Sequence, residues 1–74
     1  MEFKRGLELV IAGAQEALAG SQTLVRHGMA LHDSRLFDAA LRKFDAALAE
    51  WPANGRAYYE RGSTLRLKSL ADAA

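Results

Sequence analysis

The side chains of this chain that could do chemistry are few, and they do not form a pattern that a reaction needs. The two histidines, His27 and His32, are five residues apart. On a helix this spacing turns them about 140° apart, whereas metal-binding pairs on a helix are four residues apart. We therefore expect a half-buried His27 and a solvated His32. His32 precedes Asp33, but the sequence places no nucleophile beside that pair. The prediction is no catalytic residue, no metal and no cofactor.

Aromatic and basic side chains offer binding chemistry instead. Trp51 stands beside Pro52 and could stack on a ligand, although we favour a structural place at the bottom of the core. The net charge is +1, which argues against a dedicated nucleic-acid binder. Basic residues of the last third are spread over several helical faces and are better interpreted as a solvated surface: Arg56, Arg61, Arg66 and Lys68.

Length and composition limit how such residues can be positioned. The chain has 74 residues, 50% of them hydrophobic, and no cysteine. It can form one domain at most, and a single core of this size contributes only about 3–5 kcal/mol. The absence of cysteine fits a reducing compartment, so we expect a cytoplasmic location. Glu8 interrupts the apolar stretch that would otherwise resemble a signal peptide, and no stretch approaches the ~20 apolar residues of a membrane span.

Apolar residues recur at three- and four-residue intervals along the whole chain, which predicts helices throughout. The expected helices cover residues 2–19, 22–32, 35–50 and 55–68, and a fifth element starts at Leu70. Gly20 and Ser21 indicate a break between the first two. Proline disfavours a helical residue before it, so Trp51 ends the third helix. Three residues are expected to cap the following helices: Ser21, Ser34 and Asn54.

An internal repeat organises these helices. Gly28 and Gly62 are 34 residues apart, and several neighbouring residues repeat with the same offset. A repeat of this length is typical of helical-hairpin solenoids, in which each unit buries its apolar face by stacking on the next. Small residues are expected at the helix crossing, where Gly28 meets Ala40 and Phe44 fills the gap beside them. In the second unit Tyr58, Gly62 and Leu65 are expected to face inward. The identical pairs are Gly28/Gly62, Leu31/Leu65, Leu36/Leu70, Asp38/Asp72, Ala39/Ala73 and Ala40/Ala74.

The repeat resembles the tetratricopeptide repeat (TPR) family. The resemblance rests on Leu24-x-x-His27-Gly28-x-x-Leu31, followed by Ala40-x-x-x-Phe44, Ala47 and Pro52. It implies an all-α fold of antiparallel helical hairpins stacked as a short solenoid, an α-α superhelix. Residues 21–54 form one repeat and residues 55–74 a truncated second one. Residues 1–20 do not fit the register and are interpreted as a capping or degenerate helix.

The resemblance also implies a function. In TPR arrays the first helix of each hairpin lines a groove that takes a peptide or helix of a partner protein. Val25 and Met29 stand where chaperone-binding members carry carboxylate-clamping residues, so that specialised role is not expected. Methionine and tyrosine suit an adaptable apolar contact instead. By matching position, the groove would hold Gln22, Val25, Arg26, Met29 and His32 from one unit, and Arg56, Tyr59, Ser63 and Arg66 from the next.

An alternative is a short self-association domain without a separate ligand. About three repeats are usually needed for a stable array, and this sequence supplies fewer. The chain would then be a piece of a longer array, or it would complete its core with a second copy of itself. A two-fold dimer closes, whereas a head-to-tail stack would grow into a filament, so we favour the dimer. The expected self-association residues are Leu65, Leu67, Leu70 and Ala74.

Overall fold

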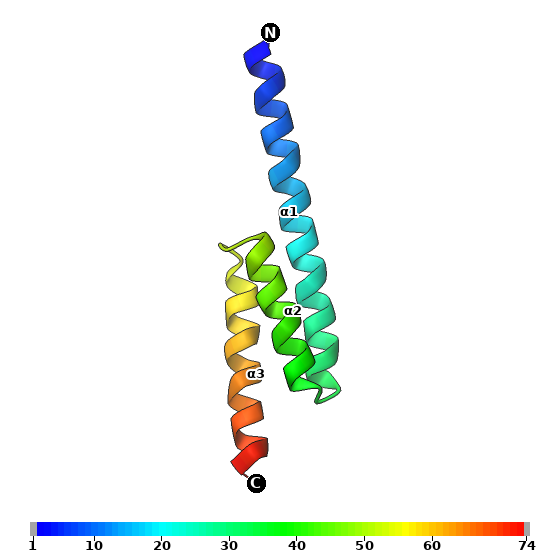
Figure 1. Ribbon diagram of the computed structural model, residues 1–74, viewed down its shortest axis with the longest axis vertical. Coiled ribbons are helices and arrows are strands. Elements are labelled where there is room, and N and C mark those ends of the chain that lie inside the picture. Colours follow the sequence, from blue (N-terminus) through cyan, green and yellow to red (C-terminus); the bar gives the residue numbers. More distant parts are fainter. Residues whose placement is uncertain (1, 74) are drawn as a thin grey trace.

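The computed structural model describes the backbone of residues 2–73 and the side chains of residues 13–73. It contains three helices, α1 (Glu2–Asp33), α2 (Phe37–Glu50) and α3 (Gly55–Ala73). Figure 1 shows α2 running back along the second half of α1, and α3 reversing direction again to run along α2. The prediction of an all-helical chain is thus confirmed for the described residues. None of their helices combines the length and the apolar character that crossing a bilayer requires.

The N-terminal half of the chain forms one helix where two were predicted. α1 continues through Gly20 and Ser21 without interruption. The expected break is wrong because the Ser21 hydroxyl does not cap a helix. It donates a hydrogen bond of 2.6 Å to the carbonyl oxygen of Ala47 on α2. A serine inside a helix is tolerated when its hydroxyl has a tertiary partner of this kind.

The turn between α1 and α2 is closed by backbone hydrogen bonds. The N–H of Leu36 donates to the carbonyl of Leu31, and the N–H of Arg35 donates to that of His32, both at 2.9 Å. This is the Schellman arrangement, which requires a left-handed residue, here Arg35 with φ of 63°. The prediction that Ser34 caps the next helix is wrong. The residue at the start of α2 is Leu36, and no side chain caps it.

The boundary between α2 and α3 agrees with the sequence. α2 ends before Trp51, and the Asn54 side-chain oxygen accepts a hydrogen bond of 3.2 Å from the N–H of Ala57. Asn54 is therefore the predicted N-terminal cap of α3. The separate fifth element predicted from Leu70 is wrong, because α3 continues as one helix to Ala73.

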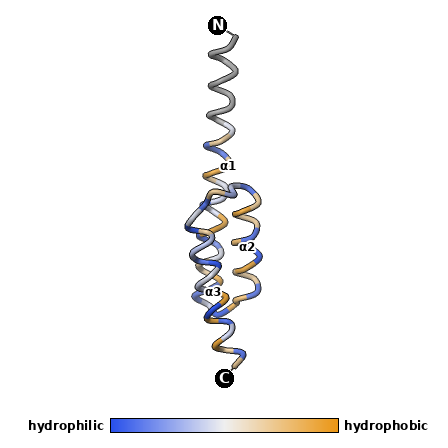
Figure 2. The backbone as a smooth tube through the Cα atoms, turned by 90° about the vertical axis from the view of Figure 1, so that its left-hand side faces the viewer, coloured by the Kyte–Doolittle hydropathy of each residue, from blue (hydrophilic) through white to orange (hydrophobic). Residues whose placement is uncertain are grey.

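The core lies mainly between α1 and α2. Phe44, Ala40 and Ala47 of α2 are fully buried, together with Val25 of α1 and Ala57 of α3. Figure 2 shows how apolar residues recur along α2 between polar ones, as expected for a helix with one buried face. Gly28 is buried on the facing side of α1. A Cβ atom there would lie only 2.5 Å from the Phe44 ring. The predicted packing of Phe44 beside Gly28 at this helix crossing is confirmed.

Several polar contacts attach α3 to the hairpin. Its inner face carries the buried residues Ala57 and Thr64. At its edge, Arg61 pairs with Asp45 and Lys68 pairs with Asp38, each at 2.7 Å. The prediction that Tyr58, Gly62 and Leu65 face inward is wrong, because all three are exposed. In the described part of the chain, no second helix covers the stripe that they form.

Candidate functional site

A cleft of about 360 Å³ separates the second half of α1 from the start of α3. It brings five of the predicted groove residues together, four from α1 and one from α3. Asn54, from the turn before α3, completes the wall. We call this surface the α1–α3 cleft, and it is lined by Gln22, Val25, Arg26, Met29, Asn54 and Arg56.

The cleft has an apolar floor and a basic rim. Val25 is 4% exposed and belongs to the hydrophobic core, so it is less accessible than predicted. Met29 is partly buried, and its Sδ atom lies 3.7 Å from the guanidinium Nη2 of Arg56. Arg56 also pairs with Glu60, one turn further along α3, at 3.4 Å. Arg26 is exposed on the α1 side and donates a hydrogen bond to the Thr23 hydroxyl, at 3.2 Å. Two guanidinium groups therefore stand beside a thioether and a valine.

A buried hydrogen-bond network fixes the base of the cleft. The Asn54 side-chain amide donates to the Ser21 hydroxyl at 2.8 Å, and Ser21 in turn donates to Ala47 on α2. Because Asn54 also caps α3, this network joins all three helices and sets where Arg56 lies relative to α1. Sequence reasoning identified Asn54 only as a cap. Its bond to Ser21, 33 residues away, carries no local sequence signal.

His32 does not lie with the other predicted groove residues. Its Nδ1 atom is 2.7 Å from the Thr64 hydroxyl, and that hydroxyl donates to the Glu60 carbonyl at 2.8 Å. With both hydrogen bonds formed, the single hydroxyl proton points to the Glu60 carbonyl and the His32 ring donates from Nδ1. The predicted half-buried His27 and solvated His32 are therefore reversed. His27 is exposed, and the part-buried His32 ring packs edge-on against Phe37 at 5.8 Å.

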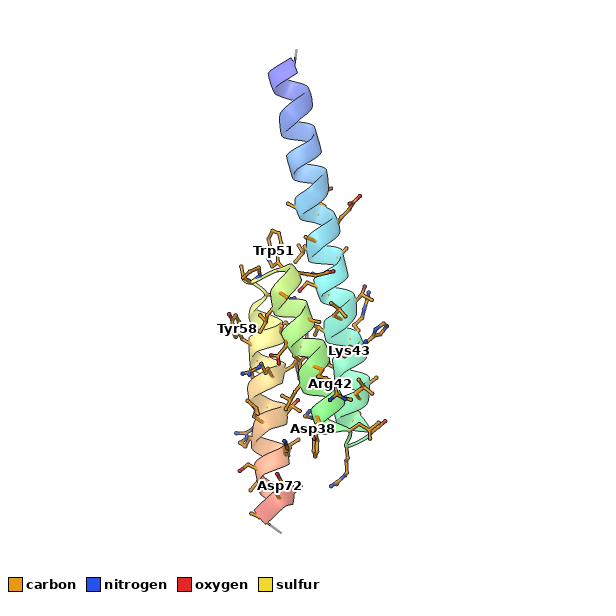
Figure 3. The ribbon with its side chains drawn as sticks, in the orientation of Figure 1. Asp38, Arg42, Lys43, Trp51, Tyr58 and Asp72 are labelled. Atoms are coloured by element: carbon orange, nitrogen blue, oxygen red, sulfur yellow. The ribbon has the colours of Figure 1, made fainter. Side chains whose placement is uncertain are left out.

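The remaining predicted groove residues surround a second hollow of about 340 Å³ on the outer side of α3. Tyr58 projects there, away from α1 and α2 (Figure 3). Tyr59 is 72% exposed beside it. We call this surface the Gly62 notch, and it is lined by Tyr58, Tyr59, Gly62, Ser63 and Arg66. The structure thus separates the predicted groove into a cleft and a notch.

The predicted self-association residues do not form one surface. Leu67 and Leu70 line a third hollow, of about 440 Å³, together with Phe37 and His32 near the α1–α2 turn. Leu65 is turned by about 160° from Leu67 around the helix, on the side of the Gly62 notch. Ala74 lies outside the described residues.

Comparison with known proteins does not identify a relative. No protein-family model, no curated protein and no solved structure matches this chain.

Proposed function

We propose that this chain is a TPR-like protein-interaction module that holds a peptide or a helix of a partner protein in the α1–α3 cleft. The role is binding without catalysis. In this proposal the hairpin of α1 and α2 is one repeat unit, and α3 is the first helix of the next, as in a short solenoid.

The observation that carries the proposal is the composition of the cleft. Met29 of the apolar floor meets Arg56, which is far away in the sequence, and a second guanidinium stands on the opposite rim at Arg26. A thioether adapts to ligands of different shape, and arginine recognises carboxylates through paired hydrogen bonds. The cleft therefore suits a peptide with an apolar side chain flanked by an acidic one.

The proposal is tested by selection from a displayed random-peptide library on the immobilised chain. Enriched peptides are synthesised and titrated against the parent chain and against Met29→Glu, which places a carboxylate on the cleft floor. The matched control is Arg42→Ala, an exposed residue on α2 that does not line the cleft. We expect binding to be lost in Met29→Glu and unchanged in Arg42→Ala. Peptides that bind both variants equally, or no enrichment at all, would contradict this function.

A second candidate is self-association. It is favoured by the exposure of Leu70, which is 62% accessible beside Leu67 and Phe37 at the third hollow. Sedimentation would then show a concentration-dependent dimer that Leu70→Asp dissociates, while Leu65→Asp, on the other side of α3, does not. A folded monomer at micromolar concentration would rule this out. The expected cytoplasmic location stays a prediction in either case.

A further inference from the structure

The two glycines of the internal repeat have opposite surroundings. Gly28 is buried, and a Cβ atom built on it would meet three atoms of the Phe44 ring within 2.9 Å. Gly62 is exposed, and a Cβ atom there would meet nothing within 4 Å. The space beside the glycine is thus filled by an aromatic ring at Gly28 of α1. At Gly62 of α3, the same position of the repeat, this space is open.

The surroundings of Gly28 show what kind of helix can cover the stripe of residues around such a glycine. On α1, the stripe of Leu24, Gly28 and Leu31 faces α2. α2 supplies Phe44 for the glycine, with Ala40 four residues before it and Ala47 three residues after it, all fully buried. The alanines let the two backbones approach, and the ring then occupies the space above the glycine. The occupant of such a stripe is an amphipathic helix with an aromatic residue between small ones.

The α3 stripe has the matching residue spacing and its own chemistry. The 34-residue offset places Tyr58, Gly62 and Leu65 where α1 has Leu24, Gly28 and Leu31. Tyr58 is 58% exposed and Leu65 41%. The residues lining the notch include one charged side chain, Arg66, and no acidic one. An arriving helix would meet Gly62 and Leu65 beside two phenol groups and one cation.

We propose that the Gly62 notch docks an amphipathic helix of a partner, which inserts an aromatic ring over Gly62 and places an acidic residue near Arg66. The docked helix presents a face like that of α2, with small residues on either side of the ring. This surface is distinct from the α1–α3 cleft, and docking here does not depend on a ligand bound there.

A peptide copied from the chain itself tests this proposal. Residues 36–52 carry the face of α2, and a hydrocarbon staple between positions 38 and 42, both exposed on α2, holds the peptide helical. A fluorescent label allows titration with the intact chain by anisotropy. We expect saturable binding, weakened by at least about tenfold when the peptide carries Phe44→Ala, since losing a buried ring costs several kcal/mol.

Variants of the chain locate where the peptide binds. Gly62→Leu fills the notch and should also weaken binding by about tenfold or more. Gly13→Leu is the matched control, because Gly13 is exposed on α1 and its Cβ would meet nothing within 4 Å. Met29→Glu separates this proposal from the proposed function, because it alters the cleft and should leave peptide binding unchanged.

Three outcomes would overturn the proposal. The first is no saturable binding of the stapled peptide. The second is equal affinity for the parent chain and Gly62→Leu, which would mean that the peptide displaces α2 from α1. The third is a concentration-dependent dimer in sedimentation that Gly62→Leu abolishes, which would identify a second copy of this chain as the occupant.

Discussion

The same pattern of residues occurs on α1 and on α3, but among the described residues it is covered by another helix only on α1. On α1 the stripe is buried, and Phe44 fills the space above Gly28. On α3 the corresponding stripe is exposed around Gly62. The difference shows that a repeated pattern fixes which face of a helix can be covered, but the covering helix has to come from elsewhere. It also separates a glycine that packing requires from one that the described fold does not use.

α3 differs from α2 in its inner contacts as well. α2 buries Phe44, Ala40 and Ala47, whereas α3 buries only Ala57 among its apolar residues. Much of the remaining attachment of α3 is polar, through Ser21 and Asn54, His32 and Thr64, and two surface ion pairs. Hydrophobic burial contributes more than exposed ion pairs, so we expect α3 to open before the α1–α2 pair separates.

The largest effect is expected from Gly28→Leu. Its Cβ would overlap the buried Phe44 ring, and a core that contributes about 3–5 kcal/mol cannot absorb the overpacking. We expect thermal unfolding followed by circular dichroism to lose its cooperative transition. Gly62→Leu is the matched substitution, and we expect it to raise stability by about 0.5–1 kcal/mol because leucine favours a helix more than glycine does. Equal melting curves for the two variants would contradict the contrast.

Removing the hydrogen-bond network at the base of the cleft should lower the stability less than Gly28→Leu does. Ser21→Ala leaves the Asn54 amide without its buried acceptor, which is expected to lower the free energy of unfolding by about 1–3 kcal/mol. Ser34→Ala is the control, because Ser34 is exposed and does not cap α2. Urea denaturation measures both changes. Equal losses in the two variants would mean that Ser21 does not tie α3 to the hairpin.

The next effect is smaller and has the opposite sign: Arg35→Gly in the α1–α2 turn is expected to raise the stability. Arg35 adopts a left-handed conformation that costs a side chain about 1–2 kcal/mol and costs glycine nothing. Glycine also loses more entropy on folding, so we expect a net gain of about 0.5–1 kcal/mol in the free energy of unfolding. Arg35→Ala keeps the strain and serves as the control. Stabilisation by both variants alike would show that backbone strain is not the cause.

The smallest effect concerns the Asp38–Lys68 ion pair between α2 and α3. The hydrogen bond from Lys68, and then its charge, lowers the pKa of the Asp38 carboxyl below its usual 3.8. A lowered folded-state pKa stabilises above the unfolded pKa, so this contribution is lost as the pH falls below about 4. In Asp38→Asn, the decrease in melting temperature between pH 5 and pH 3 should therefore be slightly smaller. An unchanged pH dependence would show that the pair does not hold α3.

The sequence predicted the periodic parts of this molecule and missed those that depend on tertiary contacts. The crossing at Gly28, the end of α2 at Trp51 and the Asn54 cap follow from local patterns, and all three are present. The break at Ser21 was predicted from capping propensity, which the hydrogen bond to Ala47 overrides. The expected helix cap at Ser34 failed because backbone hydrogen bonds close that turn instead.

The candidate site was predicted only in part for a similar reason. Helical spacing places Gln22, Arg26 and Met29 on one face, and the cleft confirms that they lie together. Spacing alone does not give the distance between two helices, so it did not show that Tyr59 and Arg66 lie at a separate notch. His32 lies outside the cleft because its ring forms a hydrogen bond with Thr64, which is 32 residues away in the sequence.

The central claim is that Gly28 lies directly against the Phe44 ring, whereas a Cβ atom on Gly62 would meet none of the described residues within 4 Å. Nuclear Overhauser spectroscopy of the labelled chain measures this contact most directly. We predict cross-peaks and an upfield ring-current shift linking the Gly28 Hα protons to the Phe44 ring, with no long-range cross-peak from the Gly62 Hα protons in the dilute chain. Absence of the Gly28–Phe44 cross-peaks in the folded protein would contradict the account.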